Sequence, residues 1–308
     1  MTFDPIAPIR LGTFPLWHLP IPTQRYMLGD HPSTIHGFGE EIVEIREMEP
    51  GDGSEWYSPI VSARMKKRMA VFHTRNEEVG VQFFLDAGPA MDFGSPSKRH
   101  VAVKIMSSLA ANIFCEPNQG TATFIGVGAR TICMPELGDQ AVAASALRRF
   151  AFNLPVYGTE ALPLPKALKL YTADTPEQLV CVFSDFLIEP RNERAWESLE
   201  TAYKRCGRQG SEVLLIRVLS PLECSLPNNA ITVRSGGNAY WSGWGTNREL
   251  QITQDTIRER LSTLCSKPNL RFLEIVWDGD EDRVTRELQE LLHARTRHLR
   301  THLDVAPA

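Results

Sequence analysis

Two aspartates close two apolar runs, and their position is the first chemical signal in this sequence. Residues 81–85 lead to Asp86, and residues 179–183 lead to Ser184 and Asp185. Such runs are typical of buried strands in an open parallel sheet, where ligands and ions bind beyond the carboxyl ends of the strands. We therefore predict that Asp86 and Asp185 share one crevice. The alternative for Asp86 is a structural role, in which it caps the Gly-Pro turn that follows.

A hydroxyl group lies between the two aspartates in the chain. Thr159 follows Gly158 in a turn-forming segment, residues 155–160, which could bring its oxygen to the same crevice. Carboxylate and hydroxyl oxygens suit a hydrated Mg²⁺ ion. Asp86, Thr159 and Asp185 are therefore our candidate metal ligands.

The order of these motifs resembles the von Willebrand factor A-like fold. The metal-ion-dependent adhesion site of that fold combines an Asp-x-Ser-x-Ser turn, a loop threonine and a later aspartate. The chain also carries Gly37-Phe-Gly39, Ser62-Ala-Arg64 and the Ser-Asp segment 183–187 in a fixed order. With these motifs, residues 35–295 resemble the bacterial family of unknown function that is often encoded beside MoxR-type AAA+ ATPases.

The comparison with that family also marks a difference. Its first motif usually reads Leu-Leu-Asp-x-Ser-x-Ser-Met, whereas residues 85–91 read Leu-Asp-Ala-Gly-Pro-Ala-Met, without either serine. The resemblance therefore implies a degenerate site that binds Mg²⁺ weakly, on the order of millimolar, and holds no tightly bound cofactor. We expect the surrounding surface to be kept for recognition. The candidate partner-binding residues are Gly88, Ala90, Asp92, Glu160, Trp241 and Trp244.

The resemblance implies a non-enzymatic protein-interaction module. Its expected partners are a MoxR-type AAA+ ATPase and an unknown client protein, whose maturation or assembly the pair would support. Some relatives lie in operons for methanol dehydrogenase maturation, which suggests metal or cofactor loading of the client. The alternative is a divalent-metal-dependent hydrolase or phosphoryl-transfer enzyme that uses the strand-end aspartates. Against it, no second aspartate follows Asp86 at two residues, and the chain has no P-loop or Gly-x-Ser-x-Gly elbow.

Alternating strands and helices must position these residues. Strands are predicted at 121–127, 131–134, 212–219 and 271–277, besides the two that carry the aspartates; helices are predicted at 97–115, 139–152, 196–207, 253–265 and 282–297. This alternation predicts an α/β fold with a doubly wound, mostly parallel sheet of the von Willebrand factor A-like or Rossmann-like class. Residues 227–252, with Leu250 to Ile252 as one strand, are predicted to form a hairpin-like insertion that carries Tyr240, Trp241 and Trp244.

The first part of the chain differs from the rest. Residues 1–34 are rich in proline, which predicts an extended arm, and we expect it to pack on its own domain through Trp17. A strand is predicted from Ile42 to Glu47. An acidic block at 40–55 and a basic cluster at 64–68 indicate either self-complementary packing or a charged docking face. We therefore divide the chain into a β-rich extension, 1–78, and a von Willebrand factor A-like domain, 79–300.

Composition excludes several classes of function. The formal net charge of −4 argues against a general nucleic-acid binder, which needs a basic excess for phosphate contacts. The six cysteines have no short metal-ligand spacing and are expected to be reduced. No signal peptide and no apolar run long enough for a membrane span is evident, so we expect a cytoplasmic protein.

Overall fold

The computed structural model describes most of the chain between residues 28 and 291. The described residues are 28–77, 79–113, 120–127, 132–137, 147, 150, 164–171, 179–187, 192–208, 211–224, 232–235, 238–241, 244–266 and 270–291. The N-terminal segment with Trp17, the Thr159 loop and most of the predicted helix 139–152 lie outside these residues.

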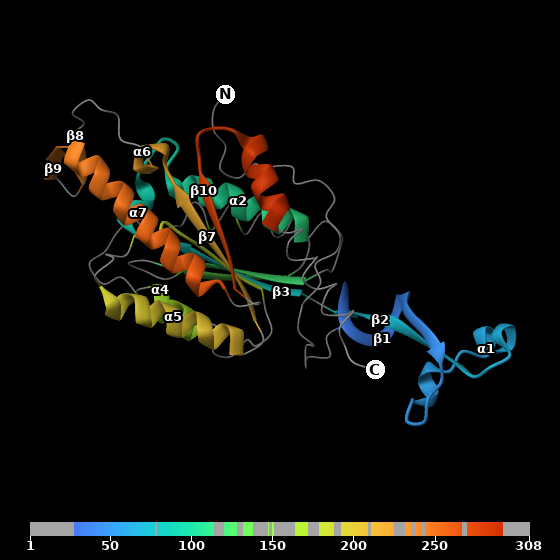
Figure 1. Cartoon of the computed structure of the whole chain (residues 1–308). Coiled ribbons are helices and arrows are strands. Elements are labelled where there is room, and N and C mark those ends of the chain that lie inside the picture. The colour runs from blue at the N-terminus through green and yellow to red at the C-terminus, as the bar shows by residue number, and fades with distance from the viewer. Residues whose placement is uncertain are drawn as a thin grey trace.

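A six-stranded sheet forms the centre of the molecule (Figure 1). Its strands are β3 (Val79–Asp86), β4 (Gly120–Val127), β5 (Ile132–Leu137), β6 (Leu179–Ser184), β7 (Glu212–Leu219) and β10 (Leu270–Val276). The order across the sheet is β10-β7-β6-β3-β4-β5, and only β5 runs antiparallel to its neighbour. The prediction of a doubly wound, mostly parallel sheet is confirmed.

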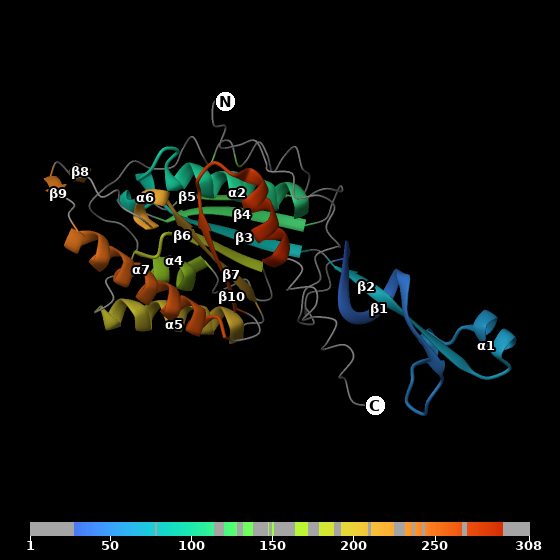
Figure 2. The same ribbon diagram turned by 45° about the horizontal axis from the view of Figure 1, so that its top comes forward.

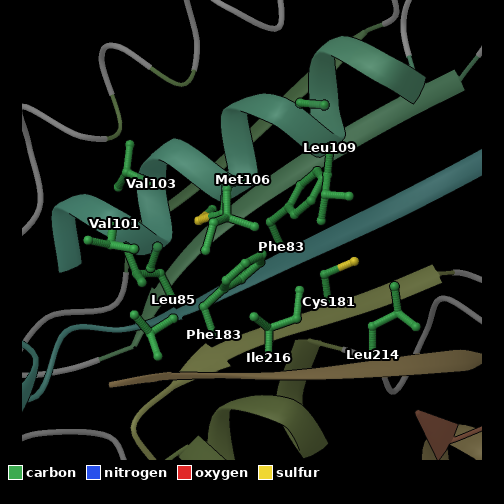
Figure 3. Close-up of a cluster of buried hydrophobic side chains, with 14 of the residues drawn as sticks. Phe83, Leu85, Val101, Val103, Met106, Leu109, Cys181, Phe183, Leu214 and Ile216 are labelled. Carbon is green, nitrogen blue, oxygen red and sulfur yellow. The ribbon is translucent and has the colours of Figure 1, made fainter. Parts of the chain in front are cut away.

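Helices cover both faces of this sheet, as Figure 2 shows. One face carries α2 (Lys98–Ile113) and the helical residues 281–291; the other carries α4 (Leu164–Tyr171), α5 (Glu193–Arg208) and α7 (Trp244–Leu264). Because both faces are buried, β6 and β7 are apolar along nearly their whole length. Figure 3 shows Phe83 and Phe183 of the sheet pointing toward Met106 and Leu109 of α2.

Helix α7 corrects one prediction. It begins at Trp244, so Leu250 to Ile252 are helical and do not form a strand. Its inward positions, 250, 254, 257, 261 and 264, keep helical spacing back to Leu250, and packing against the sheet therefore favours the longer helix. The hairpin itself is present as β8 (Thr232–Ser235) and β9 (Asn238–Trp241). Helix α4 was not predicted.

The N-terminal part forms a separate two-stranded arm that extends away from the main sheet (Figures 1 and 2). Its strands, β1 (Leu28–Glu47) and β2 (Met69–Glu77), are antiparallel; between them lie the 3₁₀ turn η1 (Ser54–Trp56) and the short helix α1 (Pro59–Met65). Lys67 Nζ lies 2.7 Å from Glu47 Oε2, which joins the basic cluster to the acidic block. This ion pair, between side chains that are 61% and 58% exposed, is one contact between the two blocks.

Candidate functional site

Asp86 lies where the strand order of the sheet reverses. From β3 the chain runs outward through β4 and β5 on one side and later through β6, β7 and β10 on the other. In a doubly wound sheet this reversal leaves a crevice at the carboxyl ends of the two central strands. Ser184, which ends β6, donates a hydrogen bond from Oγ to Asp86 Oδ2 at 2.7 Å. The last residues of the two central strands are therefore joined directly.

The turn after β3 closes tightly around Asp86. The backbone N–H of Gly88 donates to Asp86 Oδ1 at 2.8 Å, and the 3₁₀ turn η2 (Pro89–Asp92) follows. A Cβ at position 88 would lie 2.9 Å from Asp86 Oδ1, so a side chain there would require this carboxylate to shift. Asp92, at the end of the turn, is exposed, and its Oδ1 lies 2.5 Å from Arg99 Nη2.

Asp185 does not face an open cation site, because a lysine holds it. Lys98, at the start of α2, places Nζ 2.7 Å from Asp185 Oδ2 and 2.5 Å from Glu223 Oε1. Glu223 belongs to the short helix α6 (Pro221–Cys224) that follows β7. Lys98 is only 2% exposed. One buried ammonium therefore joins the segments that follow β3, β6 and β7.

Backbone groups hold the same two carboxylates from the other side. Leu187 N–H donates to Asp185 Oδ1 at 3.0 Å, and Ser220 N–H donates to Glu223 Oε2 at 2.9 Å. Each carboxylate thus receives a backbone hydrogen bond on one oxygen and the ammonium on the other.

A buried arginine, Arg217, binds the backbone of the Asp185 segment. Arg217 of β7 is fully buried and donates from Nε to the backbone oxygen of Asp185 at 3.1 Å. Its Nη1 lies 2.7 Å from Glu274 Oε2 of β10, and it also bonds Gln254 of α7. Burial lowers the pKa of Arg217, and the charge of Glu274 opposes that change. Through Arg217, the Asp185 segment is therefore connected to β10 and α7, which lie outside the strand ends described above.

Burial controls the acidity of the crevice. It raises the pKa of Asp86 above its ordinary value, while the Ser184 hydroxyl lowers it and the charge of Asp185 raises it further. Burial also raises the pKa of Glu223, although the charge of Lys98 lowers it. In both groups the loss of solvation outweighs the favourable partners.

The described residues do not fit a Mg²⁺ ion. Both oxygens of Asp86 and both oxygens of Asp185 already accept hydrogen bonds, and the ammonium of Lys98 supplies positive charge where an ion would. Gly88 and Ala90 have no hydroxyl groups to offer. Within the described part of the chain, no three His, Cys, Asp or Glu side chains are grouped as metal ligands.

The remaining predicted site residues fall in two places. Thr159 and Glu160 lie outside the described residues. Trp241 ends β9 and Trp244 begins α7, beyond the short helix α6 in the chain. The structure adds Lys98, Glu223 and Arg217, which sequence reasoning missed. Arg217 had a usable signal, since it is the one charge inside the apolar run 213–219.

Comparison with known protein families assigns the chain to one of them. A family model described as "Protein of unknown function DUF58" matches residues 44–267, more than half of the sequence. The chain belongs to the DUF58 family. The match begins within β1 of the arm and ends just after α7, so it includes every segment that Lys98 joins. No curated protein matches this DUF58 chain.

Several solved structures are similar to this DUF58 protein. Protein BatB from Bacteroides thetaiotaomicron is 15% identical, with 70% of this chain and 99% of that chain covered and a TM-score of 0.39. An aerotolerance-related membrane protein from Bacteroides fragilis is 11% identical, with 70% and 99% covered and a TM-score of 0.40. The pilus adhesin SpaC from Lactobacillus rhamnosus GG is 11% identical, with 72% and 30% covered and a TM-score of 0.42.

In the described part of this chain, every helix is too short or too polar to span a membrane.

Proposed function

We propose that this DUF58 protein is a non-enzymatic interaction module whose strand-end surface binds a partner protein. The partner class, a MoxR-type AAA+ ATPase acting on a client in assembly or maturation, comes from the family resemblance in the sequence. Metal or cofactor loading of that client is part of the same proposal.

A pair of exposed leucines at the crevice carries this proposal. Leu187 follows β6 and is 53% exposed, and Leu222 follows β7 and is 41% exposed. Since β6 and β7 are adjacent and parallel, the two leucines extend from neighbouring strand ends. Neighbouring apolar side chains surrounded by polar groups match the apolar centre and polar rim of protein-binding surfaces.

The backbone that carries these two leucines is also held in place. Leu187 N–H bonds Asp185, Leu222 precedes Glu223, and Lys98 binds both carboxylates. Little backbone conformational entropy is then lost when a partner covers these segments, which favours binding.

Two substitutions test the proposed surface. Leu187→Glu and Leu222→Glu should each weaken binding of a MoxR-type AAA+ ATPase about tenfold or more, since loss of an apolar anchor at an interface costs about 1.4 kcal/mol or more. Affinity would be measured by titrating the purified ATPase on the immobilised protein. Leu170→Glu is the matched control, because Leu170 is also exposed, at 60%, but belongs to helix α4 rather than to a segment that directly follows β6 or β7.

The outcome also separates binding from catalysis. Unchanged affinity in both crevice variants would place the partner elsewhere. Hydrolysis of generic phosphate, ester or peptide substrates with Mg²⁺ or Mn²⁺, abolished by Asp86→Asn, would favour the enzyme alternative instead.

A further inference from the structure

We propose that the Lys98 ammonium is the resident cation of the strand-end crevice, so that this site holds its carboxylates together without a divalent metal. A metal ion in such a site gathers oxygen ligands from several loops and neutralises their charge. In this protein a side chain of the chain itself makes those contacts.

The geometry of Lys98 is that of a bridging cation. Its Nζ lies within 2.7 Å of oxygens from two different strand-end segments, Asp185 after β6 and Glu223 after β7. Its charge also acts on Asp86 at the end of β3. The lysine therefore acts on an acidic group at the end of each of three adjacent parallel strands.

Burial makes this charge necessary. Asp185 is 4% exposed, and the Glu223 side chain is 14% exposed. A buried carboxylate without a counter-charge is strongly unfavourable, and two of them close together are worse. Removal of the ammonium should therefore leave a site that needs some other cation.

Another buried lysine on the same helix shows that burial alone does not create this arrangement. Lys104 of α2 is 5% exposed, but its Nζ pairs at 3.0 Å with Glu281, whose side chain is 50% exposed. Its carboxylate partner can be solvated when the lysine is lost. Lys104 is thus a control with similar burial on the same element.

If the proposed function holds, the position of Lys98 also limits which chemical groups of a partner protein the site can bind. A metal in an adhesion site keeps one position open for a carboxylate of the partner. The Lys98 ammonium is buried and already holds two carboxylates, so an acidic partner group finds no such position. The exposed apolar side chains of the segments that Lys98 joins, Leu187 and Leu222, are then the ones left for recognition.

The test uses the purified full chain alone, so its failure is independent of any partner. The melting midpoint of the unmodified protein should be the same in EDTA as in about 5 mM MgCl₂ or MnCl₂, because stabilisation requires a ligand concentration above the dissociation constant. Lys98→Met in EDTA should melt roughly 10 °C lower, and Mn²⁺ should raise that midpoint. Adding Asp185→Asn to Lys98→Met should abolish the rise. Lys104→Met should show no response to Mn²⁺.

Two results would overturn the proposal. The first is a Lys98→Met protein that gains no stability from Mn²⁺, which would make Lys98 an ordinary buried ion-pair residue. The second is Mg²⁺ binding by the unmodified protein at micromolar concentration in calorimetry, removed by Asp185→Asn. The calorimetric measurement decides the question even if Lys98→Met does not fold.

Discussion

Gly88 sets the shape of the turn beside Asp86. Its φ of −58° is ordinary for any residue, so the glycine is not needed for backbone conformation. Its effect is on the packing, because a Cβ there would lie 2.9 Å from Asp86 Oδ1, an oxygen that accepts the hydrogen bond of Gly88 N–H. A side chain at position 88 would have to displace the Asp86 carboxylate or open the turn.

We expect Gly88→Ala to lower the free energy of unfolding by about 1–3 kcal/mol, the usual cost of overpacking. Gly207→Ala is the matched control, because a Cβ at Gly207, near the end of α5, meets no atom within 4 Å. That control should be neutral or stabilising by up to ~1 kcal/mol, since alanine favours helix. Urea unfolding followed by circular dichroism measures both. Equal effects in the two variants would contradict the crowding at Gly88.

For single residues, the sequence predicted the positions of Asp86 and Asp185 but not the lysine that binds Asp185. Asp86 and Asp185 were predicted because each ends an apolar run, and strand ends have a fixed place in a parallel sheet. Lys98 stands in the polar stretch Ser97-Lys-Arg-His100, where nothing distinguishes a buried lysine from the basic residues beside it. Its burial depends on how α2 meets the segments after β6 and β7, which is a tertiary property.

Among the elements, long periodic segments were the most predictable. The predicted strand 212–219 coincides with β7, and the predicted helix 97–115 differs from α2 by only a few residues at its ends. Helix α4 is about two turns long and contains Pro165, so its sequence indicated a turn as readily as a helix. Its helical state depends on packing against α5, with which it makes contact.

The arm contains an ion pair whose effect should depend on pH. Arg46 Nη2 lies 2.7 Å from Asp52 Oδ1, and Glu49 N–H donates to Asp52 Oδ2 at 2.7 Å. The Arg46 hydrogen bond, together with that of Glu49, holds the pKa of Asp52 below its ordinary 3.8. A lowered pKa means that the ionised carboxylate stabilises the folded arm above pH 3.8. This stabilisation is lost as the pH falls through the folded-state pKa.

Hydrogen exchange measures this prediction directly. In the unmodified protein, the protection of the Glu49 amide should fall as the pH drops below 3.8. In Asp52→Asn the protection should be weaker at neutral pH and independent of pH over the same range, because no charge is lost. Exchange in β7 of the same sample serves as the internal reference. The same pH dependence in both proteins would show that Asp52 does not control the arm.

For the whole molecule, the two described hydrophobic clusters begin after the arm. Every member of these clusters lies at residue 81 or later, whereas the buried apolar residues of β2, Met69, Ala70, Val71 and Phe72, belong to neither cluster. In the described residues, β1 and β2 form a two-stranded sheet of their own. A unit with its own core is expected to fold by itself.

A chain of residues 79–308 should therefore fold, with a melting midpoint within roughly 5 °C of the full chain. That shift corresponds to about 1–2 kcal/mol for a protein of this size. Thermal unfolding followed by circular dichroism measures it. A larger fall would show that residues before Val79 stabilise the sheet, as the predicted packing of Trp17 requires.

Lys98 and Gly88 also restrict how this protein could change over evolution. Acquiring an ion site would require hydroxyls at positions 88 and 90 and the loss of the lysine charge. A side chain at 88 crowds Asp86, and loss of the ammonium leaves two buried carboxylates unpaired, so each of these first steps lowers stability. Selection for folding would remove such intermediates before all the changes accumulated. Lys98 and Gly88 therefore make a metal-binding site difficult to reach by single substitutions.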